Sequence, residues 1–235
     1  MNILDCMSKY KIQNLVFSSS CTVYGQPDQL PVTENTPKKD AESPYGNTKA
    51  IAEEVLRDVV KVTPDIKVIA LRYFNPIGAH PSALIGELPS GVPNNLVPFI
   101  TQTAAGLRKQ LSVFGDDYNT PDGSCIRDYI NVVDLAKAHV VAINRLLENL
   151  NAKRYEFFNV GTGTGVSVLE VLNTFEKATG VKVNYKIVAR RSGDIEKIYA
   201  DTTIANTVLG WKSETSLSDT LLSAWNWEKK IRKIK

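Results

Sequence analysis

A phenol and an ammonium group lie four residues apart in the segment Tyr45-Gly-Asn-Thr-Lys49. This spacing places both side chains on one face of a helix that begins there. An ordinary tyrosine has a pKa of about 10, which is too high for a general base at neutral pH. A nearby cation such as Lys49 would favour the phenolate. The pair therefore predicts an acid/base centre in which Tyr45 moves the proton and Lys49 is its electrostatic partner.

Hydroxyl side chains precede this pair in the segment Phe17-Ser-Ser-Ser-Cys-Thr-Val-Tyr-Gly25, which ends a predicted strand. Parallel α/β sheets place ligands at the carboxyl ends of their strands, where Ser18, Ser20 and Thr22 would lie. We therefore expect the serine-rich strand end to meet the Tyr/Lys pair. A hydroxyl from Ser20 or Thr22 would relay or orient the proton at Tyr45.

A strand, a helix and a second strand would position these groups. Apolar residues predict a short buried strand at 14–18, an amphipathic helix at 45–62 and an interior strand at 67–73. That order predicts a right-handed parallel crossover. Residues 2–9 show helical spacing, so the chain is expected to begin inside a helix.

Beyond Pro76 the pattern changes to loops and shorter elements. It predicts helices at 96–107, 133–147, 166–179 and 217–230, and strands at 111–114, 155–160 and 183–188. The fold class expected is α/β, with an incomplete, C-terminal part of a Rossmann-type parallel sheet and a smaller α/β substrate-binding lobe. Residues 1–75 are assigned to the first domain and 76–235 mainly to the lobe, with some segments returning to the first domain.

Composition excludes several classes. The 235 residues are 43% hydrophobic and 23% charged, which favours a globular protein over a disordered one. The net charge of +3 comes without a basic stripe interleaved with aromatics, so no nucleic acid is expected as a partner. No apolar run approaches the roughly 20 residues that span a membrane. Three widely spaced cysteines suggest neither a disulfide framework nor a metal site, and a cytoplasmic location fits best.

Further motifs accompany the Tyr/Lys pair, and in their order and spacing they resemble the UDP-glucose 4-epimerase family, within the extended short-chain dehydrogenases/reductases. The resemblance covers nearly the whole chain. The segments that carry it are Phe17–Gly25, Ser43–Lys49, Leu71–His80, Pro93–Pro98, Phe114–Tyr118, Asp122–Ile130 and Arg190–Asp194.

The resemblance implies roles for individual residues. Tyr45 would be the catalytic base, Lys49 its partner and a ligand of the nicotinamide ribose, and Ser20 the hydroxyl that contacts the sugar. NAD is the implied cofactor, with a site formed by Ser18, Ser20, Tyr45, Lys49 and Phe74. A UDP-hexose is the implied substrate, held by Ser20, Tyr45, Asn75, Asn95, Leu96, Ser112, Val113, Phe114, Arg127, Tyr129, Arg191 and Asp194. A homodimer is also implied.

Two details of that substrate site bear on its chemistry. Arg127 and Arg191 suit a diphosphate, because guanidinium groups bind phosphate oxygens with two parallel hydrogen bonds. Ile198 lies where the family adjusts the size of its hexose pocket, so acceptance of N-acetylated sugars stays open. The implied reaction is transient oxidation at C4 of the hexose, after which the hydride returns to the other face.

A complete family member would open with a strand and a glycine-rich turn that holds the NAD pyrophosphate. Nothing before Asn14 supplies such a turn, and the glycine cluster Gly161-Thr-Gly-Thr-Gly165 has the wrong spacing and falls in the substrate lobe by the resemblance. We therefore expect the chain to lack the N-terminal NAD-binding half and to be inactive alone.

Two alternatives remain open. One is another nucleotide-sugar epimerase or a dehydratase of the same superfamily. A dehydratase would be expected to carry an acidic residue near the catalytic hydroxyl, where this sequence has Ser20, Cys21 and Thr22. The other alternative is a non-catalytic remnant that binds a UDP-sugar or a partner chain.

Overall fold

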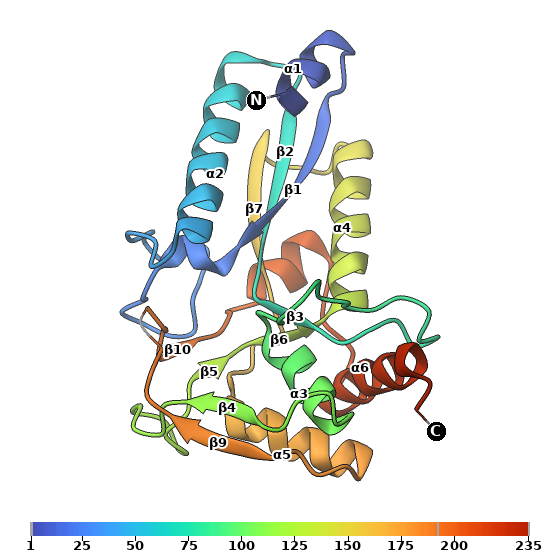
Figure 1. Ribbon diagram of the computed structural model, residues 1–235. Coiled ribbons are helices and arrows are strands. Elements are labelled where there is room, and N and C mark those ends of the chain that lie inside the picture. The colour runs from blue at the N-terminus through green and yellow to red at the C-terminus, as the bar shows by residue number, and fades with distance from the viewer. Residues whose placement is uncertain (1, 192, 235) are drawn as a thin grey trace. The chain divides into compact units, whose positions relative to one another are not determined.

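The computed structural model describes residues 2–191 and 193–234 and divides into two compact units (Figure 1). Unit 1 is formed by the described residues of Met1–Tyr73, Ala136–Val160 and Asp201–Lys212. Unit 2 is formed by those of Phe74–Leu135, Gly161–Ala200 and Ser213–Lys235. Each unit therefore gathers segments that are far apart in the sequence.

A parallel sheet lies at the centre of unit 1. Its strands are β1 (Asn14–Ser20), β2 (Lys67–Tyr73) and β7 (Tyr155–Val160), in the order β1-β2-β7. The middle strand β2 is buried along most of its length, which explains its continuous apolar run. The expected α/β fold with a parallel sheet is confirmed.

Helices α2 (Pro44–Val62) and α4 (Val132–Leu147) flank this sheet on opposite sides (Figure 1). Helix α2 begins at Pro44 because the Ser43 hydroxyl accepts a hydrogen bond from the Gly46 amide and Pro44 suits the first turn. Helix α1 (Asn2–Lys9) is also present, as expected from its spacing. A short 3-10 helix, η1 (Cys21–Tyr24), follows β1, and a π-helical turn, η2 (Ala205–Leu209), completes the unit.

Unit 2 packs three helices and several short strands around one core. The helices are α3 (Leu96–Ala104), α5 (Val168–Thr179) and α6 (Leu217–Arg232). Their apolar faces meet strand residues such as Val113, and the rings of Phe175 and Trp225 stack edge to face at 5.9 Å. The strand pairs are β3 (Asn75–Ile77) with β6 (Tyr129–Asn131), β4 (Leu111–Phe114) with β9 (Tyr185–Val188), and β5 (Ile126–Arg127) with both β8 (Val166–Ser167) and β10 (Lys197–Ile198).

Three expectations about elements need correction. The helix predicted at 166–179 starts at Val168, because Ser167 caps it and exchanges hydrogen bonds with Glu170. The helix predicted from 96 ends at Ala104 rather than at 107. The strand predicted from 183 begins at Tyr185. In the part of the chain that the structure describes, no helix combines the length and apolar character needed to cross a membrane.

Candidate active site

The start of α2 lies against the carboxyl end of β1 and brings three predicted groups together. The Lys49 ammonium donates a hydrogen bond of 2.8 Å to the Ser18 carbonyl. Its nitrogen lies 5.4 Å from the centroid of the Tyr45 ring. The Ser20 side chain lies close enough to the Tyr45 phenol to lower its pKa. The residues predicted for the acid/base centre are thus neighbours in unit 1.

The Tyr45 side chain is accessible, with 52% of the residue exposed, so a ligand can reach the phenol. Partial burial raises the pKa of Tyr45 above its ordinary value, nearby Tyr73 acts in the same direction, and the hydrogen bond with Ser20 opposes them. This direction differs from the expectation that Lys49 favours the phenolate. The Lys49 ammonium is directed to the Ser18 carbonyl and to the face of the Tyr45 ring.

The sequence left open whether the hydroxyl of Ser20 or that of Thr22 acts on the proton at Tyr45, and the structure distinguishes the two. Ser20 is buried, contacts Tyr45 and accepts a hydrogen bond of 3.2 Å from the Thr22 amide. The Thr22 hydroxyl is buried without a hydrogen-bond partner among the described residues. Ser20 is therefore the hydroxyl placed to orient a proton at Tyr45.

Two side chains that the sequence analysis did not single out support this strand end. His139, on α4, lies with Nε2 3.0 Å from the Ser18 hydroxyl. Glu53, on α2, accepts a hydrogen bond from the Ser19 hydroxyl. Glu53 could have been noticed from the sequence, because it lies one helical turn beyond Lys49 on the same face. His139 is 121 residues from its partner, and no local pattern indicates it.

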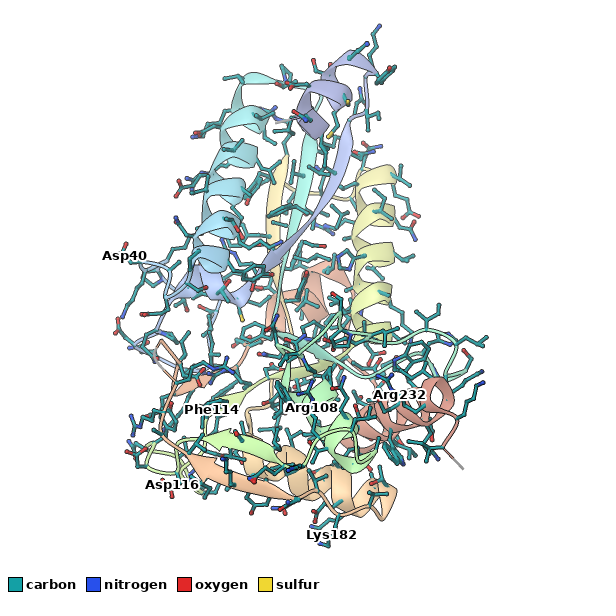
Figure 2. All side chains as sticks on the ribbon, viewed as in Figure 1. Asp40, Arg108, Phe114, Asp116, Lys182 and Arg232 are labelled. Atoms are coloured by element: carbon teal, nitrogen blue, oxygen red, sulfur yellow. The ribbon has the colours of Figure 1, made fainter. Side chains whose placement is uncertain are left out.

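The residues predicted to bind the substrate, apart from Ser20 and Tyr45, all lie in unit 2. Arg127 forms an ion pair of 3.3 Å with Asp194, and both are largely buried. Phe114, labelled in Figure 2, is the last residue of β4. The Arg191 guanidinium lies 4.9 Å from the Phe114 ring centroid. These two arginines are the groups that suit a diphosphate.

Other predicted binding residues of unit 2 have mainly structural surroundings. Asn95 is the residue before α3 and donates a hydrogen bond of 2.7 Å to Glu87, and Leu96 is the first residue of that helix. Tyr129 lies in the hydrophobic core, and burial raises the pKa of its phenol. Ser112 and Val113 belong to β4, Asn75 begins β3, and Phe74 is only 2% exposed.

The glycine cluster Gly161–Gly165 wraps around a buried carboxylate of its own unit. Asp128 accepts hydrogen bonds from the Thr162 amide and hydroxyl at 2.8 and 2.7 Å, and from the amides of Gly163 and Ala200 at 3.0 and 3.2 Å. A Cβ atom at Gly161 would lie 2.4 Å from the Asp128 carboxylate, so the approach requires glycine. The amides of Thr162 and Gly163 are hydrogen-bonded to Asp128, so they do not form a binding site for a pyrophosphate.

Comparison with known proteins agrees with these motifs. The family model described as GDP-mannose 4,6 dehydratase matches residues 1–223. The UDP-glucose 4-epimerase of Drosophila melanogaster is 49% identical over 226 residues, which cover 96% of this chain and 64% of that protein. That of Mus musculus is 47% identical over 97% of this chain and 65% of its own length. The chain thus spans about two thirds of the length of these relatives.

The family match corrects the expectation that the chain lacks the N-terminal NAD-binding half. The match begins at residue 1, and the residues that follow form α1 and the parallel β1-α2-β2 unit. The expectation depended on one local signal, a glycine-rich turn before Asn14. The family model instead matches the residues of all these elements. The N-terminal part of the chain is therefore similar in sequence to the family.

A solved structure supports the same relationship. The crystal structure of a UDP-glucose 4-epimerase from Stenotrophomonas maltophila, with bound NAD and formylated UDP-arabinopyranose, superposes with a TM-score of 0.93 at 47% identity. It covers 99% of this chain, which in turn covers 68% of that chain. The motifs, the sequence identity and the shared fold together show that this chain belongs to the UDP-glucose 4-epimerase family.

Proposed function

We propose that the protein carrying this sequence interconverts UDP-glucose and UDP-galactose by transient oxidation at C4 of the hexose, with bound NAD. One observation carries the proposal: the Tyr45 phenol, the Ser20 hydroxyl and the Lys49 ammonium gather where α2 meets the end of β1. This set can hold a sugar hydroxyl and remove its proton.

The stereochemical problem at C4 explains why oxidation is needed. The hydrogen on that carbon is not acidic, so simple deprotonation cannot invert the centre. Removing the hydroxyl proton while hydride leaves the carbon gives a ketone, whose two faces can both be reduced. NAD, when bound, supplies the acceptor and donor of that hydride. Tyr45 holds and returns the proton, and Ser20 orients the hydroxyl.

The raised pKa of Tyr45 makes positive charge at this site important. A phenol that is neutral at pH 7 is a weak base, so a cation must favour its ionised form. The Lys49 ammonium is the nearby cation, 5.4 Å from the centroid of the ring. The same residue donates to the Ser18 carbonyl, which fixes its position. The positive nicotinamide ring would add a second charge.

We assign binding of the UDP-hexose mainly to unit 2, as part of a sugar-nucleotide lobe at residues 76–235, and binding of NAD to residues 1–75, with Phe74 at its nicotinamide end. A diphosphate carries more charge than the single carboxylate of Asp194 and would compete with it for Arg127. Arg191, whose guanidinium lies over the Phe114 ring, supplies a second positive group for the diphosphate. The Bifidobacterium longum epimerase has been solved with NAD+ and UDP, which supports the ligand class.

The proposal is tested by incubating the purified protein with NAD and UDP-galactose and measuring UDP-glucose. Tyr45→Phe should lower kcat by about 10²–10⁴-fold because the general base is lost. Tyr10→Phe is the matched control, since Tyr10 is 66% exposed and follows α1. Full activity of the Tyr45 variant would contradict the assigned role. A 4-keto-6-deoxy product would indicate a dehydratase, and UDP binding without conversion would indicate a binding protein.

A further inference from the structure

One face of α2 carries a row of three polar side chains. Tyr45, Lys49 and Glu53 follow one another at intervals of four residues, so they lie above one another along the helix. Tyr45 is 52% exposed, whereas Glu53 is only 2% exposed. The row therefore runs from the accessible acid/base centre into the interior of unit 1.

Each member of this row contacts one of three successive serines of β1. The Ser19 hydroxyl donates a hydrogen bond of 2.5 Å to Glu53, and Ser19 is completely buried. On either side of Ser19 on the strand, the Ser18 carbonyl contacts Lys49 and the Ser20 side chain contacts Tyr45. Glu53 therefore binds the same short stretch of β1 that contacts Tyr45 and Lys49.

Arg72 extends this contact to the neighbouring strand. Its Nε donates to Glu53 Oε1 at 2.9 Å and its second terminal nitrogen to Oε2 at 2.6 Å. Arg72 lies beside Ser19 in the β1–β2 register. A guanidinium held by two parallel bonds has a fixed orientation. Glu53 therefore links α2 to both β1 and β2.

Lys38 completes the surroundings of Glu53 from the loop before α2, with its ammonium 2.6 Å from Oε2. Burial alone would raise the pKa of Glu53. The hydrogen bonds and charge of Arg72, together with hydrogen bonds from Lys38 and Ser19, outweigh burial and hold the pKa at about 2. The carboxylate is charged at neutral pH. A buried ion pair contributes little net stability, since desolvation offsets the attraction, but it does fix geometry.

We propose that Glu53 is a positioning residue for the reaction: by joining Ser19 and Arg72 it fixes the height and rotation of α2, so that the Tyr45 phenol meets the Ser20 hydroxyl. The inference deepens the proposed function and rests on it. Glu53 does not touch the reacting atoms and acts through the helix that carries Tyr45 and Lys49.

The test is Glu53→Asp, which keeps the charge and withdraws the carboxylate by one methylene. A displacement of about 1 Å at a reacting group can cost about 10²-fold in rate, so kcat should fall by about that factor. KM for UDP-galactose should change less than about threefold, because the affected interaction is needed only during the chemical step. The Tyr45 pKa, followed by phenolate absorbance, should rise further as the Ser20 contact is lost.

Glu156→Asp is the matched control in the same unit. Glu156 pairs with Arg145 through two hydrogen bonds of 2.8 and 3.2 Å, which join β7 to α4 rather than to β1 or α2. Thermal unfolding of both variants should change by similar amounts. Only Glu53→Asp should change kcat and the Tyr45 pKa.

Equal losses of kcat in the two variants, or a Glu53→Asp enzyme with unchanged kcat and unchanged Tyr45 pKa, would overturn the inference. If Glu53→Asp does not fold, Ser19→Ala removes one link while leaving the Glu53–Arg72 pair, and kcat should fall with KM preserved. If the unaltered protein has no activity, the proposed function fails. In that case, the inference is decided by the Tyr45 pKa alone, measured in the Glu53→Asp and Glu156→Asp proteins.

Discussion

At the scale of single residues, the pKa of the Tyr45 phenol connects the structure to the reaction rate. Partial burial raises the pKa of the phenol in the protein without ligands, and the Ser20 hydroxyl acts in the opposite direction. Because a general base works in its deprotonated form, activity should increase as the pH rises towards the pKa of Tyr45. A bound cation that lowers this pKa would extend activity towards neutral pH.

Titration of the phenolate absorbance, corrected with the Tyr45→Phe protein, measures this pKa directly. It should lie above the ordinary tyrosine value of 10.0, and Ser20→Ala should raise it further. Thr22→Ala is the control, because the Thr22 hydroxyl has no hydrogen-bond partner within the described chain. A Tyr45 pKa below 10 would contradict the dominant effect of burial, and a pKa that does not respond to Ser20→Ala would show that the Ser20 contact is misassigned.

The proximity of the residues predicted for the acid/base centre could be expected because their sequence signals are local. Ser43-Pro44 predicts the start of α2, and the spacing from Tyr45 to Lys49 places both on one face. The supporting residues were less predictable. The apolar residues that predict the amphipathic helix at 45–62 include Ile51, yet Ile51 is 51% exposed and the charged Glu53 is buried. A buried charge is recognised only when its partner, Arg72 on another strand, is known.

At the scale of elements, several loops of unit 2 are hydrogen-bonded to one buried residue, Asp128. Asp128 is completely buried and accepts four hydrogen bonds from Thr162, Gly163 and Ala200. Its own carbonyl accepts a bond of 2.9 Å from the Asn75 amide, the first residue of β3. Burial raises the pKa of Asp128 although these hydrogen bonds oppose the change. Several connections of unit 2 therefore converge on one residue.

Asp128→Asn should lower the free energy of unfolding by about 2–3 kcal/mol. The substitution replaces one carboxylate oxygen, which accepts hydrogen bonds, by an NH2 group, which would face the donors of Thr162, Gly163 and Ala200. Asp117→Asn is the control: Asp117 is exposed and pairs with Arg190 at the surface, where such pairs contribute little. Urea unfolding measures both. Equal stability of the two variants would mean that the Asp128 network does not hold these loops together.

These connections could not be predicted from local patterns. The strands β5, β8 and β10 have only two residues each, too few for a period to be visible. The contact between Asp128 and the glycine cluster joins residues more than 30 positions apart. The glycine spacing correctly indicated that the cluster is not a pyrophosphate loop, but not what it encloses.

At the scale of the whole molecule, the predicted catalytic residues and most of the predicted substrate residues belong to different units. UDP should therefore stabilise the protein through unit 2 even when the acid/base centre is altered. At a concentration of 100 times its Kd, a ligand adds about 2.7 kcal/mol to the stability of the folded state. Thermal unfolding with and without UDP measures this increase.

Arg127→Ala should abolish most of the stabilisation by UDP, because the diphosphate loses a guanidinium. Arg190→Ala is the control, since Arg190 pairs with Asp117 and lies 4.0 Å from the Tyr118 ring centroid without being assigned to the substrate. Tyr45→Phe should retain the full effect of UDP. A normal response of the Arg127 variant would place the diphosphate elsewhere.

The central claim is that C4 of the hexose is inverted by removal and return of the same hydride, with Tyr45 handling the proton. UDP-galactose labelled with deuterium at C4 tests this most directly, in ordinary water and with NAD present. The account predicts UDP-glucose that keeps the deuterium at C4, formed by the unaltered protein and at a greatly reduced rate by Tyr45→Phe. Replacement of the deuterium by hydrogen from the solvent, or unchanged conversion by Tyr45→Phe, would contradict it.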